Sequence, residues 1–180
     1  MIQLPGRDVG MQRVGDIYLA RHSVVVGEVR IGADSSVWPF VSIRGDVAAI
    51  TIGERCCIQD QTMVHTRTGE DLVIADDVAI GHQACVHCRS VGAHTLIGIG
   101  ATVLDGAVIE EGCIVAAGAV VRPGERVAAG SLVAGVPARR VRSVTDPERA
   151  YIDRIIDSYR ELARRHADGE LAGAPPGPAG

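Results

Sequence analysis

The chain has 180 residues, a formal net charge of -4 at pH 7 and only 3% aromatic residues. This length fits one domain with its own core, and the scarcity of aromatic residues predicts a core of aliphatic side chains. No basic block indicates a nucleic-acid partner, and no run of about 18 apolar residues indicates a membrane span. The N-terminus lacks a signal-peptide pattern and the five cysteines do not suggest a secreted disulfide framework, so we expect a cytoplasmic protein.

Aliphatic residues recur every six positions through most of the chain. In the second half the series runs unbroken from Val91 to Val133, and a small residue such as Ala101 or Ala107 usually stands four positions after each aliphatic one. A period of six fits neither an α-helix nor an alternating strand. It predicts a parallel β-helix in which six residues form one face and three faces form one coil, with small residues and glycines at the corners.

We therefore predict an all-β solenoid over residues 11–141. The general crossover rule favours right-handed connections, so its left hand is an expectation from the family resemblance given below. Three breaks interrupt the period, at Ile43–Ile52, Val64–Ile74 and Val86–Val91. Because these breaks cluster, we expect a functional site beside them.

The C-terminal segment predicts a helix over residues 146–168 that packs on the outside of the β-helix. Thr145 or Asp146 can cap it, and Pro147 suits its first turn. Apolar residues then recur at helical spacing up to Leu162. Residues 169–180 are expected to be a disordered tail.

Three histidines lie in the stretch with the register breaks. Val64 to Val86 makes one full coil, and His65 and His87 each follow one of these aliphatic residues directly. They should therefore lie one above the other on the same face, about one strand spacing or 4.8 Å apart. Two imidazoles so placed can bind one cation.

His82 follows Ile80 by two positions and lies on the preceding face, so it is not expected to reach the same metal within one chain. It could reach a metal held by a neighbouring chain, which predicts a homotrimer with three sites at the subunit interfaces. The alternative is that all three are ordinary surface histidines on an exposed face, with no ligand to bind. If the break at Ile43–Ile52 is a local bulge, Arg44 lies beneath His65 and Asp60 beneath His82.

RGD at Arg44–Asp46, QD at Gln59–Asp60, and then His65, His82 and His87 follow one another in a characteristic order and spacing. In these motifs the chain resembles the gamma-class carbonic anhydrase family, over about residues 10–165. The resemblance implies a left-handed β-helix homotrimer that binds Zn2+, with Fe2+ or Co2+ as alternatives, and acts on CO2 and bicarbonate. It also implies that Arg44 and Asp46 form an interface pair and that Gln59 lies beside the metal-bound water. The metal ligands that the resemblance implies are His65, His82 and His87.

Several positions depart from the family pattern. A long acidic loop with a proton-shuttling glutamate is replaced by TRTGED, in which Glu70 is a poor substitute. A family glutamate is Val47 here, a family asparagine is Cys57, and the usual HGC reads His87-Cys88-Arg89. These departures resemble the short-loop branch of the family, so we expect zinc-dependent CO2 hydration limited by proton export.

Two other functions remain open from the sequence. One is a hexapeptide acyltransferase that uses acyl-CoA, because the same β-helix carries both chemistries. The other is a non-catalytic trimeric scaffold that keeps its metal for structure. Cys85-x-x-Cys88 is either a redox pair or two packed small residues, and the roles of Cys57, Cys85 and Cys88 are not assigned.

Overall fold

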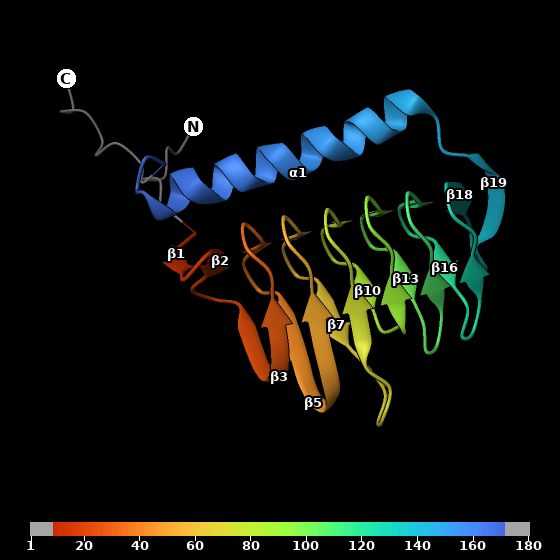
Figure 1. The fold of residues 1–180 in the computed structure, drawn as a ribbon, viewed down its shortest axis with the longest axis horizontal. Helices are drawn as coiled ribbons and strands as arrows, with labels where there is room; N and C mark the ends of the chain where they lie inside the picture. The colour runs from red at the N-terminus through yellow and green to blue at the C-terminus, as the bar shows by residue number, and fades with distance from the viewer. Residues whose placement is uncertain (1–8, 172–180) are drawn as a thin grey trace, which may run out of the picture.

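The computed structural model describes residues 9–171. Its strands wind into a left-handed parallel β-helix, and one helix lies along the whole length of the solenoid (Figure 1). The predicted fold class is therefore confirmed. The part of the expected disordered tail at residues 172–180 lies outside the described residues.

One face of the solenoid is a nine-stranded sheet in the order β1-β2-β4-β6-β9-β12-β15-β18-β19. All neighbours are parallel except the two end pairs, β1–β2 and β18–β19, which are antiparallel hairpins. The strands are β1 (Met11–Val14), β2 (Ile17–Ala20), β4 (Ser36–Val37), β6 (Cys57–Ile58), β9 (Ala79–Ile80), β12 (Leu96–Ile97), β15 (Ile114–Val115), β18 (Ser131–Ala134) and β19 (Arg139–Ser143).

The other two faces form a single ten-stranded sheet, because one long strand turns the corner between them. β5 (Ser42–Ile52) pairs with β7 through Ser42–Arg44 and with β8 through Ile50–Ile52, and β3 (Val24–Ile31) pairs alongside it. The remaining strands are β7 (Met63–His65), β8 (Leu72–Ile74), β10 (Cys85–Val86), β11 (Ser90–Val91), β13 (Thr102–Val103), β14 (Val108–Ile109), β16 (Val120–Val121) and β17 (Arg126–Val127).

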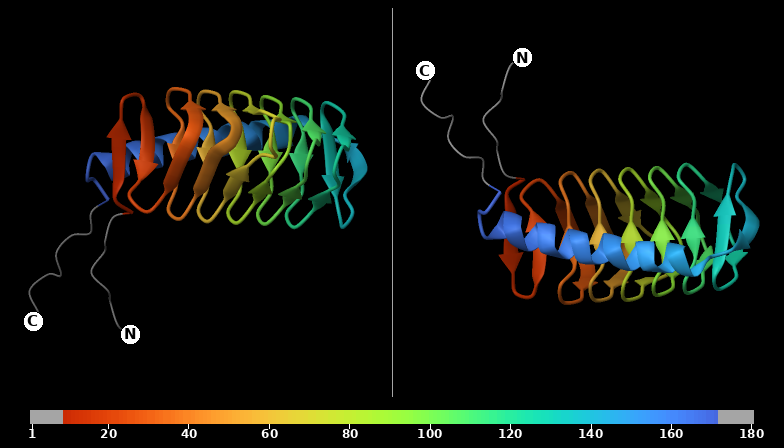
Figure 2. Two further views of the ribbon diagram at one scale, coloured as in Figure 1. Left: turned by 90° about the horizontal axis from the view of Figure 1, so that it is seen from below. Right: turned by 90° about the horizontal axis from the view of Figure 1, so that it is seen from above.

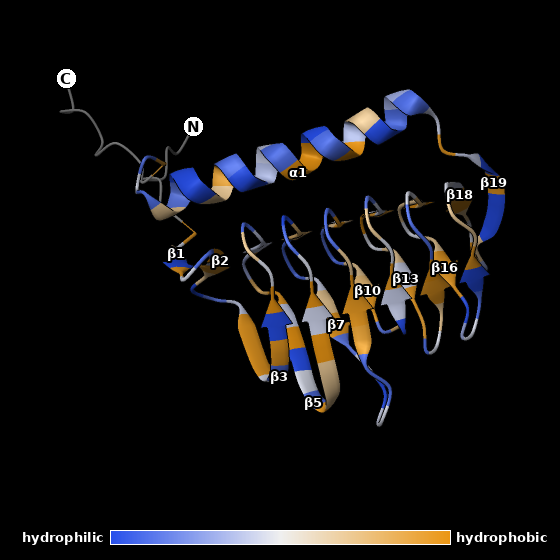
Figure 3. Ribbon diagram, in the orientation of Figure 1, coloured by the Kyte–Doolittle hydropathy of each residue, from blue (hydrophilic) through white to orange (hydrophobic). Residues whose placement is uncertain are grey.

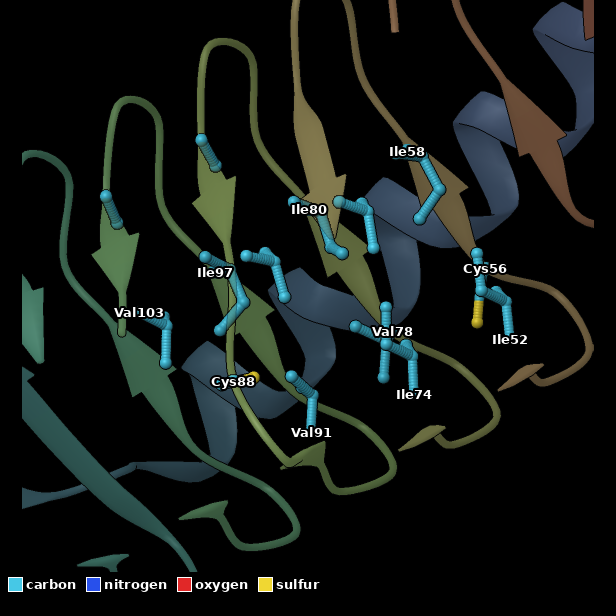
Figure 4. Packing of buried hydrophobic residues seen from close by; sticks show 14 of the residues in the cluster. Ile52, Cys56, Ile58, Ile74, Val78, Ile80, Cys88, Val91, Ile97 and Val103 are labelled. Carbon is cyan, nitrogen blue, oxygen red and sulfur yellow. The ribbon is translucent and has the colours of Figure 1, made fainter. Parts of the chain in front are cut away.

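The six-residue period corresponds to the inward-facing columns of the core. Ile58, Ile80 and Ile97 are cross-strand partners in successive coils and are fully buried, and Figure 4 shows these side chains packed one above another inside the solenoid. Burial of each such side chain contributes about 1.5–3 kcal/mol. Small residues at the corners, such as Thr62, bond to the backbone of the next coil, with Thr62 Oγ1 donating to Gly81 O at 3.1 Å.

The break between Ile43 and Ile52 is a local protrusion of β5, since Ile43 pairs with Val64 and Ile52 pairs with Ile74. Arg44 is therefore the cross-strand partner of His65, as that register requires. β3 and β5 approach closely at Gly45, where an added Cβ would lie 2.5 Å from the carbonyl oxygen of Glu28. Only glycine fits this position next to Arg44 and Asp46.

Helix α1 (Asp146–Ala167) runs back along the nine-stranded sheet from its β19 end to its β1 end (Figure 2). Its Ile152, Ile156 and Ala163 are buried against the solenoid, and Figure 3 shows mostly hydrophilic residues on the rest of the helix. No helix among the described residues is long and apolar enough to cross a membrane.

Trp38 fixes the last turns of α1 on the solenoid. Its ring makes edge-on contacts with Tyr159 at 5.1 Å and with His166 at 5.9 Å between ring centroids. His166 is half-buried in this contact. The helix is thus positioned by aromatic packing as well as by its aliphatic face.

Candidate metal centre

His65 and His87 lie one coil apart on the same face, because β7 and β10 are parallel neighbours with Val64 opposite Val86. Their ring centroids are 5.1 Å apart. His65 Nδ1 and His87 Nε2 face each other at 3.1 Å. The sequence placed these two side chains together, and the structure does the same.

A carboxylate holds the outer nitrogen of each ring. His65 Nε2 lies 3.1 Å from Asp46 Oδ1, and His87 Nδ1 lies 2.9 Å from Asp105 Oδ1. When each imidazole donates its proton to that carboxylate, both remaining lone pairs point at one another. Carboxylate partners of this kind fix the tautomer and the ring orientation of metal-binding histidines.

Asp46 stays ionised because Arg44 donates to its Oδ2 at 2.6 Å. This hydrogen bond lowers the pKa of Asp46 below its ordinary value of 3.8, burial opposes the shift, and the contact with His65 lowers the pKa further. The Arg44–Asp46 pair thus supplies His65 with a permanently charged acceptor at neutral pH. In this chain the pair lies within one subunit.

The His65–His87 pair fits a zinc ion. Two nitrogens bound to tetrahedral zinc at about 2.0–2.1 Å lie roughly 3.3 Å apart, which is close to the observed 3.1 Å between Nδ1 of His65 and Nε2 of His87. Two facing lone pairs repel unless a proton or a cation lies between them. The donor set is therefore suited to a metal, and it supplies two of the four positions.

His82 lies on the corner between the nine-stranded sheet and the His65 face. Its Nδ1 is 3.0 Å from Asp60 Oδ2, and its Nε2 is 3.1 Å from the hydroxyl of Tyr159 on α1. No three metal-binding side chains gather within the described part of one chain. The three histidines do not meet in a single subunit, so their joint role as ligands stays a prediction.

Gln59 lies next to this corner, at the end of a cavity of about 370 Å³ under α1. Its side chain is buried and its Nε2 is 3.9 Å from Cys57 Sγ. His82 and Tyr159 line the same cavity, together with apolar residues such as Ile155. Desolvation, with smaller contributions from Cys57 and Asp60, raises the pKa of Tyr159 to about 12, so its hydroxyl stays protonated and can donate to His82.

Sequence reasoning missed Asp105 and Tyr159. Asp105 follows Leu104, which lies one coil beyond His87, so the column register alone could have placed it beside that histidine. Tyr159 could not be found this way, because its place depends on how α1 packs. Glu70, the weak candidate for a proton shuttle, forms an ion pair with Arg67 at 3.0 Å.

Comparisons with known proteins match this architecture. Residues 90–123 match the family model for bacterial transferase hexapeptide, six repeats. The hexapeptide transferase family protein of Anaplasma phagocytophilum has a solved structure with a TM-score of 0.80 and 38% identity, covering 84% of this chain and 89% of that one. These similarities support the solenoid and leave the chemistry open.

Two curated relatives carry more specific names. Gamma carbonic anhydrase 1, mitochondrial, of Arabidopsis thaliana is 40% identical over 158 residues, covering 84% of this chain and 58% of the plant protein. The chain thus spans little more than half the length of that relative. Carbonic anhydrase of Geobacillus kaustophilus is 43% identical over 150 residues, covering 83% of this chain and 82% of that protein. With identity at this level over most of both chains, the protein belongs to the gamma carbonic anhydrase family.

Proposed function

We propose that this protein catalyses the reversible hydration of CO2 to bicarbonate with a zinc ion, as a homotrimer with three metal sites at its subunit interfaces. The observation that carries the proposal is the 3.1 Å approach of His65 Nδ1 to His87 Nε2, with an aspartate beside the outer nitrogen of each ring. The Geobacillus kaustophilus relative, which is 43% identical and bears the name carbonic anhydrase, supports the reaction.

In this proposal His65 and His87 hold the metal from one chain, and His82 of the partner subunit supplies the third nitrogen. A zinc ion held by these three histidines would make hydroxide available from water at about pH 7. Asp46 and Asp105 would hold the imidazoles of His65 and His87 in the tautomers that leave a nitrogen for the metal. Asp60 would leave Nε2 of His82 as its metal-binding nitrogen, which the hydroxyl of Tyr159 has to release first.

The remaining side chains position the reactants. Gln59 offers a buried carboxamide beside His82, which suits orientation of the attacking oxygen or of bicarbonate. Tyr159 shields the same corner and offers a neutral hydroxyl. Arg44 keeps Asp46 charged, which in turn keeps His65 oriented.

Proton export should limit the rate, because Glu70 is held in an ion pair with Arg67 at 3.0 Å. We expect slow CO2 hydration that rises with the concentration of imidazole buffer, since an external base can replace a missing shuttle. Stopped-flow measurement with zinc-loaded protein tests this. A zinc-loaded trimer that stays inactive at every buffer concentration would favour the non-catalytic scaffold.

A shared site can be tested by mixing two defective chains. His65→Ala and His82→Ala should each bind little zinc alone. After the two are co-refolded in equal amounts, three quarters of the trimers are mixed and each mixed trimer regains one intact site of three, so about a quarter of the wild-type zinc should return. Metal analysis and CO2 hydration of the mixture measure the recovery.

The matched control mixes His65→Ala with His87→Ala. Both lesions then lie in the half-site that one chain supplies, so no arrangement of these chains restores a site, and zinc should stay low. Recovery in the control, or no recovery in the first mixture, would place the three ligands differently from this proposal.

Zinc is the proposed metal, with Fe2+ or Co2+ as the alternatives to be separated by metal analysis after anaerobic purification. A cytoplasmic location is proposed from the five free cysteines, although the name of the Arabidopsis relative places that protein in mitochondria. The acyltransferase alternative predicts saturable binding of acetyl-CoA, and calorimetry with acetyl-CoA would detect it.

A further inference from the structure

The corner that carries His82 has bulky residues in a conformation that normally favours glycine. Phe40, Gln61 and Gln83 stack in successive coils with φ of 62°, 62° and 60°. The next two coils use Gly100 and Gly118 at the same place, each with φ of 65°. A side chain in the left-handed region costs conformational free energy, so the first three coils accept a cost that the later coils avoid.

Of these three side chains, that of Phe40 is the least stabilised by contacts within the described part of its own chain. Gln61 and Gln83 at least bond to each other, with Gln83 Nε2 donating to Gln61 Oε1 at 3.1 Å. The ring of Phe40 stacks only on His22, at 5.7 Å between centroids, and remains 64% exposed. A large apolar side chain that is both strained and exposed indicates a contact outside the chain.

A matching apolar surface lies on the His65 face. Val24 and Val26 on β3 are 51% and 44% exposed, and they precede Ser42 and Arg44 by one coil in the same columns. On the other side of the histidines, Leu104 stands one coil beyond His87. The corner has its own apolar side chain at that level, since Ile99 lies one coil beyond His82 and is 54% exposed.

The height of each coil along the solenoid axis determines which of these residues can meet between two subunits. The alignment of the subunits rests on the proposed function. If His82 joins His65 and His87 of a second copy, and the symmetry axis of the ring runs parallel to the solenoid, equal coils face one another. Each coil rises about 4.8 Å. Phe40, two coils below Gln83, then comes opposite the gap between Arg44 and Val26. Ile99, one coil above His82, comes opposite the gap between His87 and Leu104.

We propose that Phe40 anchors the assembly by packing on Val24 and Val26 of the partner subunit. Ile99 makes the corresponding contact with Leu104 of the partner subunit. The metal site lies between these two apolar contacts, which exclude water on both sides of it. The occupant of the exposed corner is thus a second copy of this chain.

Phe40→Gly separates assembly from folding. Glycine accepts φ of 62° without strain, so the substitution relieves the chain while it removes the ring. Sedimentation in the presence of EDTA measures the protein concentration below which the metal-free assembly dissociates. We expect this concentration to be at least about tenfold higher for Phe40→Gly than for the wild type. The melting temperature of the fully dissociated chain should not fall.

Asp34→Gly is the matched control. Asp34 lies in the same coil as Phe40, is exposed and has φ of 58°, but stands on a different corner. The same relief of strain there should leave the dissociation concentration within about twofold of the wild type. Equal assembly of Phe40→Gly and wild-type protein would overturn the inference.

A photo-crosslinking phenylalanine analogue at position 40 tests the register directly. Irradiation of the full-length protein should join position 40 to the segment around Val24–Val26 or Ser42–Arg44 of a second copy, and mass spectrometry identifies the peptide. Crosslinks to α1 or to the β14 face would overturn the inference. If assembly depends on Phe40 but the protein binds no zinc, the proposed function is wrong and the role of Phe40 in assembly is supported.

Discussion

At the scale of single residues, the candidate site depends on which ring nitrogen of each histidine carries a proton. His87 offers Nε2 to the neighbouring imidazole only while Nδ1 donates to Asp105. The carboxylate accepts this hydrogen bond and cannot donate one, so it fixes a single tautomer. An amide in its place could present its NH2 group and stabilise the other tautomer.

Asp105→Asn should therefore weaken zinc binding by about 10- to 100-fold, the usual effect of removing such a partner. Competition with a zinc-sensitive dye measures the change. Asp16→Asn is the control, because Asp16 lies at an exposed turn where its carboxylate pairs with Arg13 at 3.7 Å, and it should bind zinc as the wild type does. Unchanged affinity in Asp105→Asn would show that Asp105 does not orient His87.

The cysteines separate by burial. Desolvation raises the pKa of Cys57 and of Cys88 to about 12, so neither thiol forms the reactive thiolate near neutral pH. Cys85 is half-buried, and its pKa is also raised, mainly by desolvation. Cys88 therefore fits a packed small residue better than one half of a Cys85–Cys88 redox pair, and Cys57 is packed in the same way.

Iodoacetamide at pH 8 should label Cys85 slowly and leave Cys57 and Cys88 unlabelled in folded protein, as peptide mass spectrometry would show. All of them should react in denaturant, which controls for accessibility of the peptides. Rapid labelling of Cys88 in the folded chain would contradict the packed role.

The sequence could predict those parts of the site that lie in the stacked columns of successive coils. The register placed His87 over His65 and Arg44 under it, because each residue has a fixed offset from a buried aliphatic neighbour. The contact between Tyr159 and His82 joins residues 77 positions apart through the packing of a helix, and no repeat encodes it. The partner of His82 in an assembly lies beyond one chain and stays a prediction.

At the scale of elements, α1 begins with a strongly fixed first turn. The carboxylate of Glu148 accepts hydrogen bonds from the backbone N–H and the hydroxyl of Thr145, at 2.9 and 2.8 Å, and both guanidinium NH2 groups of Arg142. The bond from Arg142, followed by those from Thr145, lowers the pKa of Glu148 from 4.5 to about 2. This turn connects the last strand, β19, to the helix.

Glu148→Gln should lower the melting temperature at pH 7, because the amide loses the charged contacts with Arg142. A carboxyl with a depressed pKa stabilises the fold above its unfolded pKa of about 4.5, and this contribution is lost as the pH falls toward about 2. The difference between variant and wild type should shrink over that range in thermal melts. Glu28→Gln, at an exposed pair with Arg30, is the control, and a difference that does not change with pH would contradict the assignment.

The sequence predicted the repeated strands of the solenoid but not the elements that close its ends. The six-residue period gave the buried columns, since every coil repeats the same geometry. The period could not give the two antiparallel hairpins at the ends, β1–β2 and β18–β19, because each closes the solenoid once and has no repeat.

At the scale of the whole molecule, zinc should stabilise the assembly more than the chain. A metal bound only by the assembled protein raises the apparent stability by mass action. EDTA should therefore lower the melting temperature of the wild type, and raising the protein concentration should offset part of that loss. His82→Ala should melt at the same temperature with and without EDTA, and a similar drop in that variant would show that the metal binds without its third ligand.

Helix α1 also sets a length relation across the molecule. A helix advances about 1.5 Å per residue and the solenoid about 4.8 Å per coil, so roughly three helical residues keep pace with one coil. Tyr159 meets His82 only because the number of residues before it in α1 matches the number of coils after His82. A chain that gains a coil beyond the site must therefore lengthen its helix by about one turn to keep this contact, whereas a coil added ahead of the site leaves it untouched.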